Sequence, residues 1–208
     1  MNNKKQFIIR LSVVVIVCLS CLVRIYDIAI LVAIPYLLIE KRINRRSWKD
    51  IGLNPRSFPG DLKKYWWLIV LPVMSGVMAV GLSKIIVPEF YQHVLERTQP
   101  ILSFDKVFLL IIQLMILAFI EELVFRAFLQ GNMSTLIKPA YAIAITSFFF
   151  SIGHYSSGAV FVVLYDLVFI FIDSLLYGII FQKTKSVYSC AFSHFLANAV
   201  GVFILLIM

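Results

Sequence analysis

The sequence has few charged residues for its length. Asp, Glu, Lys and Arg make up 14% of the 208 residues, whereas 61% are hydrophobic and the mean hydropathy is +0.93. A water-soluble domain of this size cannot bury so much apolar surface. The scarcity of charge therefore excludes a soluble globular domain and indicates an integral membrane protein.

Other absences narrow the class further. The three cysteines give no even disulfide framework, and the chain has no internal repeat, low-complexity tract or HExxH metal motif. Cys18 and Cys21 have CxxC spacing, but both lie inside the first apolar run, where we interpret them as packing residues.

No small-residue cleavage site follows the first apolar run, which begins after Lys4 and Lys5. We therefore expect an uncleaved anchor rather than a signal peptide.

The net charge of +8 is concentrated in one hydrophilic segment, about residues 40–64, between apolar runs. Its basic residues are Lys41, Arg42, Arg45, Arg46, Lys49, Arg56, Lys63 and Lys64. Such a segment is typical of a cytoplasmic loop under the positive-inside rule, and its charge suits anionic lipid. We therefore expect membrane lipids as partners and no nucleic acid. Within the segment, Ser47 to Leu53 forms either a surface-lying helical turn or a solvated loop.

About 20 apolar residues cross a bilayer as a helix, so we expect an all-α transmembrane bundle of about seven spans, with roughly six to eight compatible with the length. The expected spans are 7–23, 25–39, 65–87, 107–130, 140–155, 159–181 and 187–207, each bounded by charges, Pro or Gly. We treat 1–208 as a single integral membrane domain, because the spans leave no room for a soluble one. Charge bias predicts a multi-pass protein of the cell membrane with a cytoplasmic N-terminus, an outer loop at 88–106 and an outer C-terminus.

Three charged residues interrupt the fourth expected span. No charge occurs from Val107 to Ile120, and then Glu121, Glu122 and Arg126 follow. One such charge at a helix centre costs roughly 2.5 to 3.5 kcal/mol on translocon-type scales. Glu122 and Arg126 share a helix face and are expected to form an ion pair. Glu121 points elsewhere and is the candidate for chemistry, although a buried polar knot that fixes helix packing would also explain the cluster.

Two later spans supply further candidates. His154 follows Gly153 near the end of the fifth span, and a straight helix would place it nearer the outer end of its span than Glu121. His194 and Asn198 are four apart, so they share a face of the last span. One carboxylate, two imidazoles and one amide suffice to activate water and to hold an oxyanion.

The remaining polar residues have less specific interpretations. Asp166 and Asp173, seven apart, share a helix face, where they either pair with Arg126, line a water-filled approach or satisfy local polar packing. His93 lies in the expected outer loop and is interpreted as a solvated side chain. Tyr177 is expected to make helix–helix hydrogen bonds or to lie at the interface.

The motifs together resemble a known family. Glu121-Glu122-x-x-x-Arg126, then Phe150-x-x-x-His154, then His194-x-x-x-Asn198 occur in that order on three spans. This arrangement is similar to the type II CAAX prenyl protease and bacteriocin-processing family, also called CPBP or Abi. The resemblance covers Glu121 to Asn198, somewhat over a third of the chain, and the motif-bearing core is expected at about 107–208. Trp48 to Leu53 is similar to the segment that often precedes the core of these enzymes.

The resemblance implies an intramembrane glutamate-type endopeptidase that cleaves membrane-associated peptides without a covalent intermediate and without a cofactor. It implies that Glu121 is the general base and that His154 orients the attacking water. His194 and Asn198 would stabilise the oxyanion, and Glu122 with Arg126 would support the site. A bacteriocin or other peptide precursor and a lipidated C-terminal tail are both compatible substrates. The Lys-, Asn- and Ile-rich composition favours a bacterial source and a peptide precursor. The oligomeric state is open.

Three alternatives stay open. A zinc-dependent membrane protease would use Glu121, His154 and His194 as Zn2+ ligands. A non-catalytic immunity or regulatory protein would bind a peptide or another membrane protein, a role to which some members of the resembled family are linked. A transporter would use the buried charges as an ion relay, but matching broken helices in two halves are absent from the sequence.

Overall fold

The computed structural model describes residues 3–100, 103 and 105–207. Within these residues the chain is helical and has no strand, which confirms the all-α prediction. The helices are α1 (Asn3–Leu22), α2 (Tyr26–Ile43), α3 (Phe58–Ile86), α4 (Phe90–Thr98), α5 (Val107–Glu122), α6 (Gly131–Met133), α7 (Pro139–Gly153), α8 (Val160–Thr184) and α9 (Val187–Ile207). Two 3-10 turns, η1 (Lys49–Ile51) and η2 (Pro55–Ser57), and a π-helical segment, η3 (Leu123–Gln130), complete the list.

Five helical segments of the described chain are long and apolar enough to cross a membrane. They are Lys4–Leu22, Pro55–Ile86, Val107–Met133, Val160–Thr184 and Val187–Ile207. The other two expected spans are also helices, but α7 has 15 residues and α2 carries charged residues at both ends. The chain is therefore a multi-pass membrane protein, and the five candidate spans are one fewer than the lower end of the expected six to eight.

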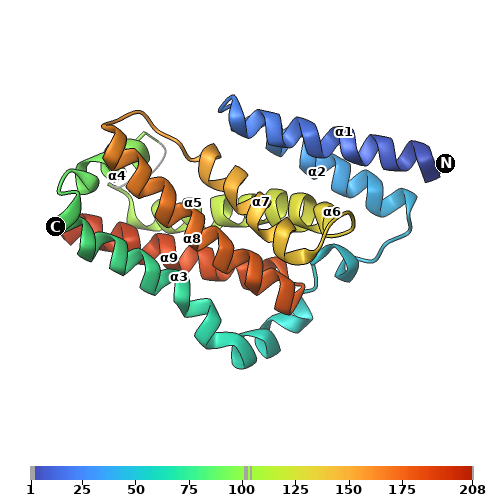
Figure 1. Ribbon diagram of the computed structural model, residues 1–208. Helices are drawn as coiled ribbons and strands as arrows, with labels where there is room; N and C mark the ends of the chain where they lie inside the picture. Colours follow the sequence, from blue (N-terminus) through green and yellow to red (C-terminus); the bar gives the residue numbers. More distant parts are fainter. Residues whose placement is uncertain (1–2, 101–102, 104, 208) are drawn as a thin grey trace.

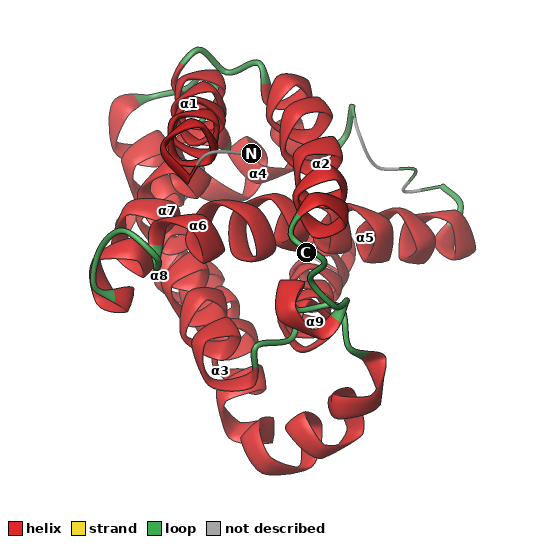
Figure 2. Cartoon of the chain, turned by 90° about the vertical axis from the view of Figure 1, so that its right-hand side faces the viewer, coloured by secondary structure: helices red, strands yellow, loops and turns green. Residues whose placement is uncertain are grey.

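Most of the long helices run along a similar direction in Figure 1, and the α5–α6 stretch crosses them obliquely, as Figure 2 shows. The α2–α3 connection, α6 and the start of α9 lie at one end, which carries the basic segment. The end of α3, α4 and the C-terminal end of α9 lie at the other. Helices α3, α5, α8 and α9 pack on one another, while α1 and α2 form an outer pair against α7 and η3.

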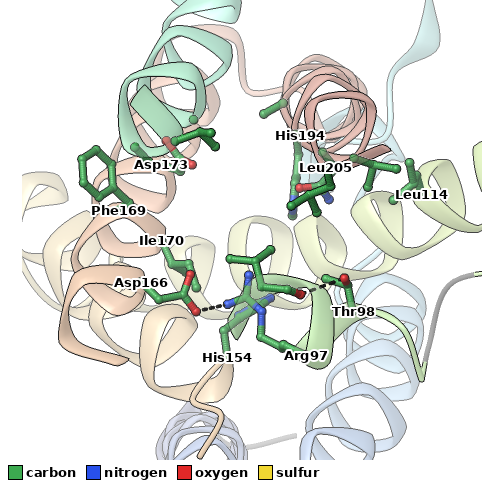
Figure 3. A pocket seen from close by; sticks show the side chains of 18 of the residues that line it. Arg97, Thr98, Leu114, His154, Asp166, Phe169, Ile170, Asp173, His194 and Leu205 are labelled. Atoms are coloured by element: carbon green, nitrogen blue, oxygen red, sulfur yellow. Dashed lines mark hydrogen bonds and ion pairs between the residues drawn. The ribbon is translucent and has the colours of Figure 1, made fainter. Parts of the chain in front are cut away.

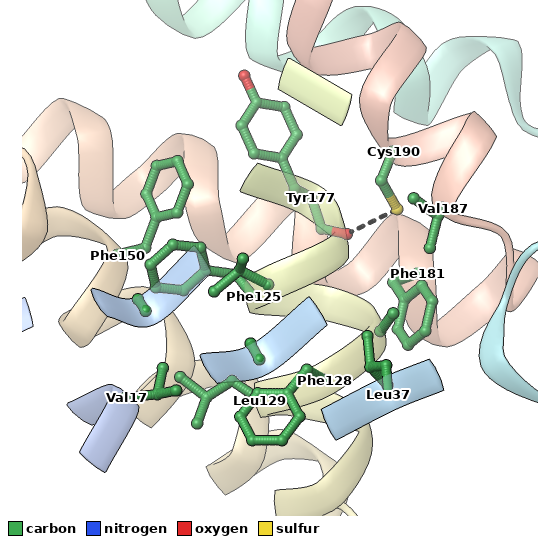
Figure 4. Packing of buried hydrophobic residues seen from close by; sticks show 14 of the residues in the cluster. Val17, Leu37, Phe125, Phe128, Leu129, Phe150, Tyr177, Phe181, Val187 and Cys190 are labelled. Carbon is green, nitrogen blue, oxygen red and sulfur yellow. Dashed lines mark hydrogen bonds between the residues drawn. The ribbon is translucent and has the colours of Figure 1, made fainter. Parts of the chain in front are cut away.

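The π-helical segment η3 is the most deeply buried part of the bundle. Every residue from Val124 to Gln130 is buried, and Phe125, Phe128 and Leu129 belong to the main apolar cluster. Figure 4 shows these side chains packed among residues of α1, α2, α7, α8 and α9. Because π-helical segments are commonly found at functional sites, this irregular turn directly after Glu121 and Glu122 marks the region for attention.

Helix α3 bends near its start. Tyr65 has non-helical backbone angles, φ −118° and ψ 19°, and the turns before it project from the bundle (Figures 1 and 2). Trp66 and Trp67, just beyond the bend, are exposed. Exposed tryptophans beside basic residues are typical of a helix at the level of the lipid headgroups.

The segment before α3 is anchored rather than freely solvated. Ile51 is buried, and Gly52 adopts a positive φ of 82°. A side chain at Gly52 would come within 2.9 Å of Phe181, so the close approach also requires glycine. The carbonyl of Gly52 accepts a hydrogen bond from the backbone nitrogen of Val187 at 2.9 Å. The Ser47 to Leu53 stretch thus contains a short 3-10 turn fastened to the start of α9.

Candidate active site

A cavity of about 280 Å3 lies among α3, α4, α5, α7, α8 and α9. Its walls are mostly apolar, and four polar residues proposed from the sequence line it: Glu121, His154, His194 and Asn198. Figure 3 shows that His154 and His194 approach the cavity from different helices. The fold therefore brings together residues that are up to 77 positions apart in the sequence, counted from Glu121 to Asn198 (198 − 121).

Glu121 lies between the two imidazoles. Its Oε1 is 3.7 Å from Nε2 of His154, and its Oε2 is 3.6 Å from Nε2 of His194. These separations exceed a direct hydrogen bond and are short enough for ion pairing. The Glu121 side chain retains 17% of its exposure, so this carboxylate can be reached from the cavity.

The depth of His154 differs from the sequence-based expectation. The helix that carries Glu121 continues through η3 and α6 to Met133, three residues beyond the expected end at residue 130. Glu121 therefore lies farther from this end of the helix than the sequence predicted. Helix α7 ends at Gly153, and His154 is the residue that follows its last turn. A longer helix on one side and a short one on the other bring the two side chains to the same level.

Glu122 has surroundings unlike those of its neighbour. Its side chain and that of Arg126 are both 0% exposed, and Arg126 Nε donates a hydrogen bond to Glu122 Oε2 at 2.8 Å. Arg126 Nη2 also donates to Ser174 Oγ on α8 at 2.9 Å. The expected ion pair between Glu122 and Arg126 is present, and it joins the end of α5 to η3. Neither residue of this ion pair lines the cavity.

His194 is fixed on two sides. Its Nδ1 lies 3.0 Å from Glu122 Oε1, and its ring stacks on Tyr177 with centroids 4.6 Å apart and planes at 20°. A carboxylate oxygen accepts hydrogen bonds, so Nδ1 carries the proton that faces Glu122. This contact directs Nε2 towards Glu121 and the cavity.

Phe150 explains the first position of the Phe-x-x-x-His motif. Its ring centroid lies 4.5 Å from that of His154 and 5.8 Å from that of His194. The guanidinium carbon of Arg126 lies 5.4 Å from the same ring. The backbone carbonyl oxygen of Phe150 also lies 2.8 Å from Nδ1 of His154 and accepts a hydrogen bond from the Nδ1–H group. Phe150 thus contacts both imidazoles.

Asn198 lines the cavity one helical turn beyond His194 on α9. Within the described part of the chain, its side chain has no hydrogen-bond partner. An amide with free donors on a cavity wall is able to bind a ligand oxygen.

The two aspartates of α8 do not pair with Arg126. Asp166 instead pairs with Arg97 of α4, and its Oδ2 is also 3.4 Å from Nε2 of His93. Asp173 lines the cavity, as one of the sequence-based interpretations allowed (Figure 3). The expectation for His93 is wrong: it is 7% exposed and lies 3.0 Å from Ser156 Oγ, because α4 packs against α8 instead of forming a solvated loop.

Sequence reasoning missed the supporting roles of three residues. Ser174 holds Arg126, Tyr177 stacks on His194, and Arg97 lines the outer part of the cavity. The sequence could have indicated that Tyr177 lies near the cavity, because it follows Asp173 by four residues and therefore shares a face of α8 with it. Arg97 carried no signal, since α4 was not expected to be a helix over the cavity.

The described residues contain no group of three or more His, Cys, Asp or Glu side chains placed to hold a metal ion. The set Glu121, His154 and His194 considered for Zn2+ is not such a group, and the zinc alternative stays a prediction for experiment. Cys18, Cys21 and Cys190 are free thiols within apolar helices.

Comparison with protein families decides the relationship. Residues 103–200 match the family model of the Rce1-like type II CAAX prenyl endopeptidases. This segment is an Rce1-like domain. The Rce1-like domain begins just before α5, ends within α9 and includes every candidate site residue. The match indicates a peptidase, and this family is one of membrane proteases, which implies membrane-protein substrates. None of the curated proteins and none of the solved structures matches the chain.

Proposed function

We propose that the protein is an intramembrane glutamate-type endopeptidase that hydrolyses peptide bonds of membrane-associated peptides or proteins. The observation that supports this most directly is the position of Glu121, reachable from the cavity and 3.6 to 3.7 Å from two imidazoles. The buried Glu122 and Arg126 form an ion pair that does not line the cavity, so we assign them a supporting role.

Glu121 acts as the general base. Its carboxylate takes a proton from a water molecule, and the resulting hydroxide attacks the substrate carbonyl carbon. His154 Nδ1 is held by the carbonyl of Phe150, so its Nε2 faces Glu121 and orients that water. The gap of 3.7 Å between Nε2 and Oε1 suits two groups that share one water molecule.

His194 and Asn198 stabilise the oxyanion. The Nδ1 proton of His194 is engaged by Glu122, so donation from Nε2 requires the doubly protonated ring. Asn198 donates from its amide. When the intermediate collapses, the proton held by Glu121 passes to the leaving amine, and no covalent enzyme intermediate forms.

The cavity also bears on the substrate. Its volume of about 280 Å3 and its apolar walls suit a short, unfolded and largely apolar segment of a peptide. A peptide precursor, such as that of a bacteriocin, and a lipidated C-terminal tail both meet this requirement. Such substrates are held at the membrane by a lipid or an amphipathic helix.

The test is quantitative peptidomics of membranes that carry the wild-type protein or Glu121→Gln. We expect peptides released by the wild type to disappear in the variant, with the residual rate at least about 100-fold lower, as for loss of an essential catalytic group. Glu89→Gln is the matched control, because Glu89 is exposed and lies outside the cavity. Identical peptide profiles for wild type and Glu121→Gln would contradict proteolysis and favour the non-catalytic immunity or regulatory role.

The zinc alternative has its own test. Loss of cleavage in EDTA, restored by Zn2+, would contradict the metal-free mechanism, while full activity in EDTA supports it.

A further inference from the structure

A second cavity, of about 650 Å3, lies at the basic end of the bundle. The α2–α3 connection, η3, α6 and the end of α8 surround it, and Arg10 of α1 reaches it from the side. These elements gather at the end of the molecule opposite α4 (Figure 1). The second cavity and the candidate active site have no lining residue in common.

The charges around this second cavity are mostly positive. Four basic residues line it, namely Arg10, Arg46, Lys49 and Lys185, against one acidic residue, Asp50. The nearby Glu40 pairs with Arg10 at 2.6 Å and lies 3.7 Å from Arg46, so part of the arginine charge is compensated.

The two lysines are not compensated in this way. Lys185 donates to the neutral Gln182 side chain at 2.8 Å, and Lys49 has no ion pair within the described chain. The lining therefore carries excess positive charge even when Asp50 and the nearby Glu40 are counted against its four basic residues.

The same cavity offers neutral donors. The side chains of Asn54 and Ser134 line it and have no hydrogen-bond partner among the described residues. Arg10 has a buried Nε that also lacks an acceptor there. Guanidinium, ammonium, amide and hydroxyl donors around one cavity form the set that binds phosphate oxygens.

The surroundings favour a lipid as the source of that phosphate. On α1, beside Arg10, the side chains of Phe7, Ile8 and Leu11 are 49%, 52% and 40% exposed. Acyl chains can cover these apolar side chains while the headgroup enters the cavity. Basic pockets between membrane helices bind anionic headgroups in this way.

We propose that the second cavity is a binding site for the phosphate group of an anionic lipid. The proposal does not depend on the proposed proteolysis. Gly52 lines the second cavity, and its carbonyl oxygen accepts a hydrogen bond from the backbone nitrogen of Val187, the first residue of α9. Occupancy therefore steadies the start of the helix that carries His194 and Asn198.

The experiment is native mass spectrometry of the full chain, released from vesicles of equal parts phosphatidylglycerol and phosphatidylcholine. We expect the wild type to retain phosphatidylglycerol in preference to phosphatidylcholine. Lys49→Gln combined with Lys185→Gln should lower this preference by about 30-fold, from the usual contribution of each basic residue near a membrane surface. Lys84→Gln with Lys106→Gln is the matched control, because it removes the same charge at exposed positions at the other end.

The outcomes separate the explanations. The proposed site would be contradicted if both double variants lost phosphatidylglycerol equally. It would also be contradicted if the wild type showed no preference for phosphatidylglycerol over phosphatidylcholine. Inorganic phosphate is the second arm. If it stabilises the delipidated protein against heat with the same dependence on Lys49 and Lys185, and phosphatidylglycerol is not retained, the occupant is free phosphate and the lipid assignment is wrong. Folding of each variant is checked by its unfolding temperature in detergent.

Discussion

Glu121 and Glu122 are adjacent and chemically identical, yet their surroundings separate them. Glu122 is 0% exposed and contacts both Arg126 and His194, whereas Glu121 keeps 17% of its exposure and lines the cavity. Burial of a charge is tolerated when an opposite charge and hydrogen bonds accompany it, as Arg126 and His194 accompany Glu122. Of the two glutamates, Glu122 therefore supports the fold, and Glu121 is available for chemistry.

This division gives a prediction on stability. Glu122→Gln removes the charge that balances Arg126 in a buried site, and loss of one partner from such a pair costs about 3 to 5 kcal/mol. Glu121→Gln changes a residue with a cavity-facing side chain and should leave stability nearly unchanged. Thermal unfolding of both variants in the same detergent measures the difference. Equal loss of stability in the two variants would contradict the separate roles.

A second prediction concerns the amide of α9. Asn198→Ala should lower kcat by about 100 to 1,000-fold, the usual effect of removing one oxyanion donor. KM should change little, because the donor acts on charge that develops in the transition state. The described chain gives Asn198 no hydrogen-bond partner, so the unfolding temperature should stay at the wild-type value. A higher KM at constant kcat would instead assign Asn198 to substrate binding.

At the residue scale, the sequence identified the chemical groups better than their partners. Motif order and four-residue spacing predicted the Glu122–Arg126 pair and the shared face of His194 and Asn198. The contact between His194 and Glu122 joins positions 72 apart, and helix spacing carries no information on such a pair. His93 was misassigned because its burial depends on the packing of α4 against α8.

At the element scale, the π-helical segment determines how the helices meet. Gln130, at its end, donates a hydrogen bond from Nε2 to the carbonyl of Gly178 on α8 at 3.0 Å. Gly178 has no side chain to separate the two elements. A Cβ there would lie 2.7 Å from Ile143 of α7 and 3.2 Å from the side-chain oxygen of Gln130. The contact of η3, α7 and α8 thus depends on a small residue.

Gly178→Ala should therefore be destabilising. Overpacking at a close contact typically costs about 1 to 3 kcal/mol, more than the roughly 0.5 to 1 kcal/mol that alanine contributes to a helix in place of glycine. Gly81→Ala in α3 is the control, since a Cβ there meets no atom within 4 Å and should not lower stability. Urea or thermal unfolding in detergent compares the two. A Gly178→Ala protein as stable as the control would show that the helices can move apart.

The element boundaries show what sequence patterns can and cannot predict. Apolar runs ended by Lys, Pro or Gly predicted the position of every long helix to within a few residues, apart from α3, which begins at Phe58 rather than 65. The π-helical turns of η3 were not predicted, because Leu123 to Gln130 is equally compatible with an α-helix. Only the packing of neighbouring helices distinguishes the two.

At the scale of the whole molecule, the charge distribution predicts orientation. Lys49 lies in the basic segment and Glu89 near the other end of α3, so the two positions should face opposite sides of the membrane. A cysteine introduced at Lys49 should react with an impermeant maleimide only after the membrane is permeabilised. A cysteine at Glu89 should react in intact cells. Both positions are exposed, and the native Cys18, Cys21 and Cys190 lie within apolar helices.

Permeabilised cells provide the control that both cysteines are reactive. Labelling of the Lys49 position in intact cells, with Glu89 protected, would reverse the predicted orientation. Labelling of both would place the two ends of α3 on one side.

The short helix α7 has a consequence for the bilayer itself. Its 15 residues span about 22 Å, whereas the hydrocarbon core of a bilayer is about 30 Å thick. Local thinning of the lipid is one way in which a bilayer accommodates a mismatch of this kind. If the bilayer thins around α7, the thinned region would include the end of α7, where His154 lies. Lipid deformation would bring the aqueous phase towards the carboxylate of Glu121 and spare the protein a long hydrophilic channel.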